Sequence, residues 1–240
     1  MPWQAPKTNW TSADGVRDTD LNRIEENTRV LYLERLRGSA TVYVSPAGND
    51  STGTGSSGAP FLTVAKALSI LPRDLNGLTA NIHFLAAGAY PENVTIKDFY
   101  GGTVILTGPV DATVSLMGLR IENCNVQVSN IALSVYSTGI FVGMGATLVF
   151  PTKPVTVTAG GITVRYGGLF EASLRATVSN ADRALQVQYG GTASIATLSG
   201  TNNSVGIFAY NSTVFVSDLQ LTATARIVNE NSAIYTRGIV

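Results

Sequence analysis

The chain has 240 residues, is 45% hydrophobic and carries 16 basic and 16 acidic side chains, so its formal net charge at pH 7 is zero. No apolar run approaches the roughly 18 residues of a membrane-spanning helix, and no basic excess points to nucleic acid. One cysteine, Cys124, and one histidine, His83, leave no internal disulfide and no zinc site of ordinary ligand spacing.

Charge is concentrated at the N-terminus. Residues 1–37 hold 12 of the 32 charged side chains, whereas residues 101–240 hold 13. The first six residues lack the charged-then-apolar pattern of a secretory signal, so we expect synthesis in a cytoplasm.

The stretch from Asp18 to Arg37 predicts one amphipathic helix. Leu21, Ile24 and Leu31 follow a heptad spacing for barely two heptads. Such a helix either forms a short coiled coil between subunits or packs within its own subunit, and the sequence leaves both arrangements open.

Three short segments follow this helix. Residues 40–44 predict a strand, residues 45–60 a loop of small polar residues and glycine, and residues 61–71 a helix. Because the loop is bracketed by two regular elements, we expect an ordered connection. We expect the second helix to plug the open end of an apolar column, since repeat proteins need such caps. Its apolar side would consist of Phe61, Val64, Ala65, Leu68 and Leu71.

The second half of the chain repeats. Seven turns rich in glycine and asparagine begin at intervals of 22, 22, 22, 23, 21 and 20 residues. They begin at Gly101, Asn123, Gly145, Gly167, Gly190, Asn211 and Asn231. This period is too short for paired-helix repeats or propeller blades, and it is typical of a coil of about three strands stacked on identical coils.

Apolar residues keep register with these turns. The third residue after each turn start is Val104, Val126, Leu148, Phe170, Ala193, Val214 or Ile234. A second column, three residues before the turns, holds Val142, Val164, Val187, Phe208 and Val228. The fifth position after each turn is also apolar in nearly every repeat, and apolar residues two apart predict one buried strand face. We therefore expect an all-β fold, a parallel β-solenoid over residues 80–240, whose seven coils form a column about 35 Å long at roughly 4.8 Å per coil.

The position between these two apolar columns should point outward. It is occupied by Ile105, Gln127, Val149, Glu171, Ser194, Phe215 and Tyr235. Four of the seven are large and apolar, and exposed apolar stripes mark interfaces. We expect Ile105, Val149, Phe215 and Tyr235, together with Leu21, Ile24 and Leu31 of the first helix, to lie in the interface of a symmetric homo-oligomer.

Two segments carry resemblances to known proteins. Residues 43–50, with Gly53-Thr54-Gly55, Ala59-Pro60-Phe61 and residues 63–68, resemble the opening segment of right-handed β-helix proteins of the pectate-lyase-like superfamily. Residues 9–16 and 20–25 resemble the N-terminal segment of many bacteriophage and prophage tail proteins.

The first resemblance implies a right-handed parallel β-helix with a short N-terminal helix and a capping helix. The second implies a virion component of tail fibre or tailspike type, made in a bacterial host cytoplasm, commonly a homotrimer joined to other tail proteins by its N-terminal segment. We therefore divide the chain into three regions. Residues 1–38 form the N-terminal attachment segment and amphipathic helix, residues 39–79 the first strand, loop and capping helix, and residues 80–240 the β-helix.

Members of this superfamily include polysaccharide lyases and glycosidases, which need clustered or paired carboxylates. The acids of the repeat region are Asp111, Glu122, Glu171, Asp182, Asp218 and Glu230. Only Glu122 and Glu230 share a column, and they would be about 24 Å apart at roughly 4.8 Å per coil, against roughly 5–10 Å in glycosidases. We expect no catalytic residue, metal or cofactor in one chain, and a structural role for His83. The sequence does not decide whether two subunits together form a carboxylate pair.

One further column has two interpretations. The residue before each turn start is Tyr100, Glu122, Met144, Tyr166, Tyr189, Tyr210 or Glu230. One interpretation is that the ring faces of Tyr166, Tyr189 and Tyr210 bind sugar rings. The other is that these rings stack on one another for stability and point inward, because their positions have the same parity as the inward Val164 and Val187.

The sequence thus predicts a structural protein of a phage or phage-like tail that presents a glycan-binding or host-surface-binding face, without nucleic acid binding or membrane insertion. Two alternatives remain on the same fold. One is a depolymerase that cleaves polysaccharide, and the other is an architectural collar or decoration fibre that touches no receptor.

Overall fold

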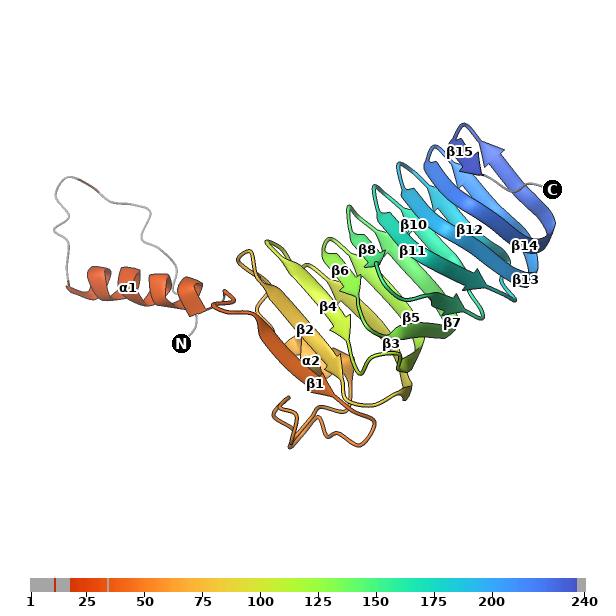
Figure 1. Cartoon of the computed structure of the whole chain (residues 1–240). Coiled ribbons are helices and arrows are strands. Elements are labelled where there is room, and N and C mark those ends of the chain that lie inside the picture. Colours follow the sequence, from red (N-terminus) through yellow and green to blue (C-terminus); the bar gives the residue numbers. More distant parts are fainter. Residues whose placement is uncertain (1–10, 12–17, 34, 237–240) are drawn as a thin grey trace.

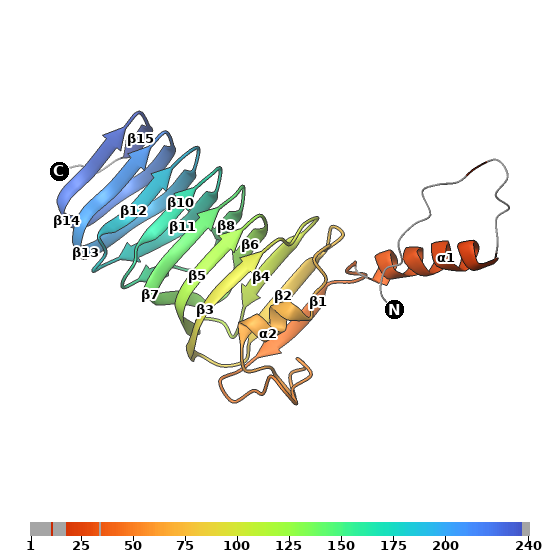
Figure 2. The same cartoon turned by 180° about the vertical axis from the view of Figure 1, so that it is seen from behind.

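The computed structural model describes residue 11, residues 18–33 and residues 35–236. These residues form a column of stacked coils from which one helix projects, as Figures 1 and 2 show. The named strands belong to one sheet, and every pairing between them is parallel. The chain is therefore a parallel β-solenoid of about seven coils, as the repeat predicts.

The elements follow one another along the column. The helices are α1 (Asp18–Leu33) and α2 (Val64–Ser69). The strands are β1 (Ala40–Val44), β2 (Thr79–Phe84), β3 (Gly88–Lys97), β4 (Thr103–Thr107), β5 (Thr113–Glu122), β6 (Asn125–Val128), β7 (Ala132–Gly143), β8 (Thr147–Phe150), β9 (Val155–Val157), β10 (Ile162–Arg165), β11 (Leu169–Val178), β12 (Arg183–Gln188), β13 (Thr192–Tyr210), β14 (Thr213–Glu230) and β15 (Ala233–Thr236).

Each coil contributes to three faces of the column. Face 1 follows the repeated turn and contains β1, β2, β4, β6, β8, the starts of β11, β13 and β14, and β15. Face 2 contains the starts of β3, β5 and β7, then β9, and later parts of β11, β13 and β14. Face 3 precedes the turn and contains the ends of β3, β5 and β7, then β10, β12, and the ends of β13 and β14.

The predicted inward column of face 1 is confirmed. Its residues stand opposite one another from Val104 to Ile234, and all but Ile234 are buried. All seven turn starts adopt a left-handed backbone, with φ between 44° and 77°. Glycine and asparagine tolerate this conformation, which explains why these two residue types mark the repeat.

The second column is correct for its first three members only. Val142, Val164 and Val187 are in register, but Val187 stands opposite Ala209, so Phe208 points outward. Val228, which pairs with Phe208, is displaced in the same way. The reason is turn length: Val187 precedes Ala193 by six positions, whereas their partners Ala209 and Val214 are five positions apart.

Both helices are shorter than the sequence predicts. α1 ends at Leu33 because Arg35 already pairs with Asp74 in an isolated bridge. α2 begins at Val64, after the Thr63 hydroxyl accepts a hydrogen bond from the Lys66 amide as an N-cap.

α2 packs against β1, β2 and β3 at the N-terminal end of the column, where it adds apolar side chains to the core. The predicted position of Ala65 is wrong, since it is exposed and Ala67 is buried in its place. Residues i, i+3 and i+4 share a helix face, and Val64, Ala67 and Leu68 have that spacing.

The loop of residues 45–60 is ordered, as expected. The Tyr43 amide donates to the Gly55 carbonyl at 2.8 Å, and the Phe61 amide donates to the Tyr43 carbonyl at 3.0 Å. The Asp50 carboxylate accepts hydrogen bonds from the Leu62 and Thr63 amides and from the Thr63 hydroxyl, and these bonds lower its pKa against the opposing effect of burial. The loop is therefore fixed to the start of α2.

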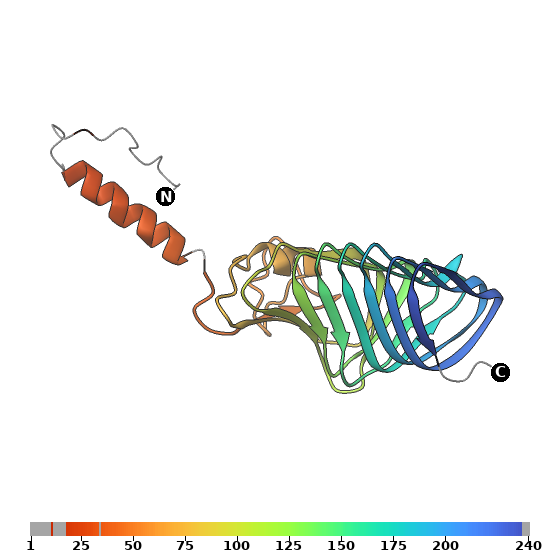
Figure 3. The same cartoon turned by 90° about the horizontal axis from the view of Figure 1, so that it is seen from above.

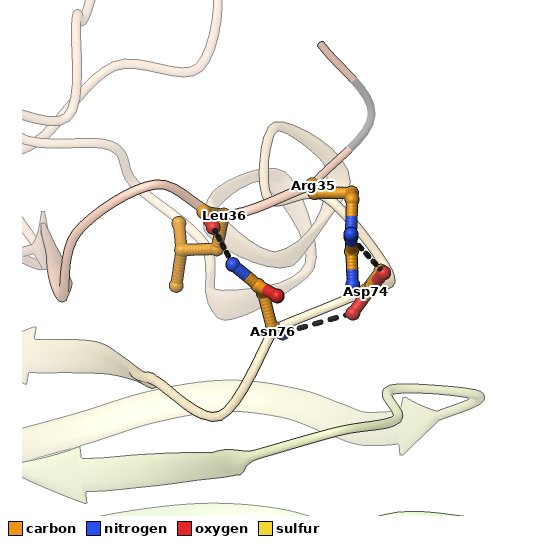
Figure 4. A network of polar contacts seen from close by, with 4 residues as sticks. All are labelled: Arg35, Leu36, Asp74 and Asn76. Atoms are coloured by element: carbon orange, nitrogen blue, oxygen red, sulfur yellow. Dashed lines mark hydrogen bonds and ion pairs between the residues drawn. The ribbon is translucent and has the colours of Figure 1, made fainter. Parts of the chain in front are cut away.

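A small polar network joins the N-terminal region to the column (Figure 4). The Arg35 Nε donates to Asp74 Oδ2 at 2.6 Å, and Asp74 Oδ1 accepts from the Asn76 amide at 2.8 Å. The Leu36 amide donates to the Asp74 carbonyl, and the Asn76 side chain donates back to the Leu36 carbonyl. Residues 35 and 36 are thus bonded to the turn that follows α2, although α1 itself projects from the column in all three views (Figure 3).

Asp74→Ala is expected to loosen this junction. It removes one ion pair and the acceptor for the Asn76 amide, at a cost of about 1 kcal/mol because the pair is partly exposed. Limited trypsin digestion should cleave faster after Arg35 and Arg37, with thermal unfolding of the solenoid little changed. Asp74→Asn keeps an amide oxygen as acceptor, so its cleavage rate should lie between those of the wild type and Asp74→Ala. Equal cleavage rates in all three proteins would contradict this role.

Cys124 is buried in its turn, where its thiol donates to the Ile96 carbonyl at 3.4 Å. Burial raises the pKa of this thiol from 9.0 to about 11. The unfolded chain therefore loses the proton at lower pH than the folded one, so the contribution to stability is complete below about pH 9 and is lost as the pH rises toward 11.

At about pH 10.5 this loss should amount to about 1–2 kcal/mol, because a pKa difference of one unit corresponds to about 1.4 kcal/mol. Urea unfolding of the wild type and of Cys124→Ser at neutral pH and at about pH 10.5 measures it. Between these two pH values the wild type should lose more stability than the serine variant, because the serine hydroxyl does not ionise in this range. The same pH slope in both proteins would show that the thiol has no such influence.

Candidate functional site

The tyrosine column lies at the corner between face 3 and face 1. Tyr166 and Tyr189 have left-handed backbones, and their side chains are 52% and 47% exposed. The inward direction expected from the parity of Val164 and Val187 is therefore wrong, because a left-handed residue interrupts the alternation of an extended strand.

The tyrosine rings contact one another. Tyr166 and Tyr189 are stacked with ring centroids 5.4 Å apart and planes 6° from parallel, and Tyr189 meets the edge of Tyr210 at 5.5 Å. Exposed Tyr100 and Met144 extend the same corner toward the N-terminal end. The result is a line of apolar ring faces and hydroxyl groups beside face 3.

The outward side of face 3 carries residues that the sequence analysis missed. One row, here called the Arg120 ladder, consists of Arg120, Phe141, Thr163, Gln186 and Phe208, each opposite the next. A second, the Arg165 ladder, consists of Arg165, Gln188 and Tyr210. These positions flank the column of Val142, Val164 and Val187, so reading the columns on either side of it would have found them.

Two arginines in this region stack on aromatic rings. The Arg120 guanidinium lies 4.0 Å from the Phe141 ring centroid, and that of Arg183 lies 4.1 Å from the Phe208 centroid. Contacts of this kind contribute about 0.5–1 kcal/mol at exposed sites and hold the planar guanidinium flat against the ring. Arg120 also forms an ion pair with Glu122.

Amide groups lie between the arginines at the centre of face 3. Gln186 and Gln188 are buried, and their side-chain amides are 2.6 Å apart. With its amide oxygen turned toward the cations, Gln186 accepts from Nη2 of Arg165 and, at 3.0 Å, from Nη1 of Arg183. The centre of the face thus holds two guanidinium groups beside two amides.

A hollow of about 180 Å³ lies at the N-terminal end of face 3. The Arg120 and Phe141 side chains form part of its wall, and the Thr138 hydroxyl donates to Asn93 Oδ1 at 2.9 Å within it. Gly118 leaves this space open, because a Cβ at that position would lie 1.9 Å from the Thr138 hydroxyl oxygen. Polar and aromatic groups therefore line face 3 from the hollow to Tyr210.

The expected apolar stripe runs along face 1, on the other side of the tyrosine corner. Its seven members stand in one ladder from Ile105 to Tyr235, as predicted. Phe215 and Tyr235 are 44% and 59% exposed, and their rings stack at 4.9 Å with planes 8° from parallel. Ile105 and Val149 are half-buried.

On α1, Leu21 and Ile24 are exposed on a helix that stands clear of the column (Figure 3). The Leu31 side chain lies outside the described residues. Leu21 and Ile24 therefore offer an apolar surface without cover from the column.

Acidic residues are dispersed over the column. Glu122 pairs with Gly143 near one end of face 3, and Glu230 pairs with Tyr210 at the other. Within residues 18–33 and 35–236, no group of three or more histidine, cysteine or acidic side chains is close enough to hold a metal ion. His83 stands on face 1 against the Tyr43 ring, 5.2 Å between centroids, and partial burial lowers its pKa.

Comparison of the chain with family models, with curated proteins and with solved structures gave no match. In the part of the chain that the structure describes, no helix is long and apolar enough to cross a membrane. Any statement on function therefore depends on the fold and on the chemistry of its faces.

The contribution of the tyrosine stack to stability is measurable with Tyr189. Tyr189→Ala removes both ring contacts and is expected to lower the free energy of unfolding by about 0.5–1.5 kcal/mol. Tyr189→Phe keeps the ring and should unfold like the wild type in urea. If the alanine variant is as stable as the wild type, the tyrosines do not stabilise the column, and ligand contact becomes the better explanation for their alignment.

Proposed function

We propose that this protein is a structural component of a phage or phage-like tail, a fibre or spike whose column presents a glycan-binding surface. The observation that carries the proposal is the continuous surface formed by the tyrosine corner and face 3. Tyrosine rings, amides and guanidinium groups lie together there on a rigid strand scaffold. These are the groups that bind sugars, since ring faces contact the apolar side of a sugar and amides bond its hydroxyls.

The geometry supports repeated weak contacts. Equivalent residues recur once per coil, and the tyrosine centroids are 5.4 and 5.5 Å apart. A chain-like glycan laid along the tyrosine corner would meet one tyrosine ring in each of three successive coils. Binding would gain strength from multivalency, because linked sites act at a high effective concentration.

A homotrimer is part of the same proposal. The apolar stripe of face 1 and the exposed Leu21 and Ile24 of α1 are surfaces that a second and third copy would cover. Residues 1–38 would then contact other tail proteins. In such an assembly the protein acts by presentation and adhesion at a host surface.

Oligomerisation is tested by the solution mass. Light scattering during size-exclusion chromatography should give the mass of three chains for the wild type. Phe215→Ser combined with Tyr235→Ser removes the most exposed aromatic pair of the stripe and should shift the mass toward one chain. Tyr189→Ala changes the tyrosine corner instead and should leave the mass unchanged. A monomeric wild type would refute the trimer.

Glycan binding is tested with an array of bacterial surface oligosaccharides and the full chain. Binding that falls in Tyr166→Ala and Tyr210→Ala, while both variants remain folded by circular dichroism, supports the proposal. New reducing ends in the bound glycan would instead indicate a depolymerase. No binding to any glycan would leave an architectural fibre as the better assignment.

A further inference from the structure

We propose that face 3 selects acidic glycans, and that the sugar carboxylate binds at Arg165 and Arg183. This inference rests on the proposed function, since it names the class of glycan that the same surface takes. It depends on how the charges of face 3 are paired and on which hydrogen-bond donors remain unused.

The cations of face 3 are not equally neutralised. Arg120 forms its ion pair with Glu122. Arg165 has no carboxylate within 4.0 Å among the described residues, and Arg183 meets only Asp182, at 4.0 Å. The Asp182 side chain is 86% exposed, so solvent screens this contact strongly. Positive charge therefore remains uncompensated around Arg165 and Arg183.

Both of these arginines are held in place before any ligand arrives. Gln186 accepts from both guanidinium groups, and Arg183 lies on the Phe208 ring. Two like charges that share one amide oxygen repel each other, and an anion placed against them relieves the repulsion. A site fixed in this way loses little side-chain entropy on binding.

Unused donors point in the same direction. A guanidinium group has five N–H donors, and the described residues bond Arg165 through Nη2 to Gln186. Its Nε is buried beyond the reach of a ligand, so a carboxylate would bond the remaining Nη donors. Carboxylates accept two parallel hydrogen bonds from arginine, which adds orientation to the charge attraction. The neighbouring Gln188 amide and the Tyr189 and Tyr210 rings suit the uncharged part of the same sugar.

The face favours a sugar acid over a nucleic acid. Glu122 and Glu230 stand toward its two ends, and the net charge of the chain is zero. A polyanion with a phosphate at every step requires a continuous basic stripe. Here the two unpaired guanidinium groups lie together at the centre of the face, which matches a glycan with an occasional carboxylate among neutral sugars.

The test uses the full chain and a panel of uronic acid-containing oligosaccharides, each compared with its own carboxyl-reduced form. The acidic form should bind about tenfold more tightly than the reduced form, which is the usual effect of a charge-assisted hydrogen bond. Added salt should reduce this difference in affinity, because it screens the charge attraction. Arg165→Gln and Arg183→Gln should each weaken binding of the acidic form about tenfold and leave the reduced form unaffected.

Arg175→Gln is the matched control. Arg175 is an exposed arginine at the end of β11 that belongs to face 2, so the substitution makes the same change in net charge away from the site. Binding should be unchanged in this variant. An equal loss in Arg175→Gln would show diffuse charge attraction and overturn the site.

The remaining outcomes separate the two proposals. Equal binding of acidic and reduced forms, lost in Tyr210→Ala, would refute acid selection and leave the glycan-binding function standing. No binding of either form would refute both. Circular dichroism of each variant identifies any substitution that merely unfolds the column.

Discussion

The structure depends on one constraint, the in-register parallel stacking of coils. In the inner coils the strands are bonded to the coils before and after them, so a strand residue has a fixed neighbour about one period away in sequence. A slip by one residue would turn every inward side chain outward. The turns absorb part of the variation in coil length: the turn at Asn211 has one residue fewer than the turn at Gly190, and faces 3 and 1 on either side of it stay in register.

The same constraint arranges the surface. Stacking converts a sequence period into lines of side chains, with apolar residues on face 1, tyrosines at the corner, and arginine, glutamine and phenylalanine on face 3. Contacts then form between residues 20 to 25 positions apart, such as the stacked Tyr166 and Tyr189 or Arg183 on Phe208. Because each line runs along a rigid column, a ligand meets groups that are already oriented, and binding requires little reorganisation.

The N-terminal end of the column is held by two sets of contacts. At the N-terminal end, α2 adds buried side chains to the core, and the Asp74 network bonds residues 35 and 36 to the first coils (Figure 4). α1 projects away from the column (Figure 3). This division suits the proposed fibre, in which the helix would contact other chains and the column would present a binding surface.

The sequence by itself determined the solenoid, the inward column from Val104 and the outward ladder of Ile105 to Tyr235, because period and alternation are local properties of an extended chain. It also predicted that Glu122 and Glu230 lie too far apart to act as a carboxylate pair. Only the tertiary structure decided the rest. Tyr166 and Tyr189 point outward because left-handed turn residues break the alternation, and Phe208 does so because the turn after it is one residue shorter. The Arg165, Gln186 and Arg183 cluster arises from lateral contact between coils, which no single repeat encodes.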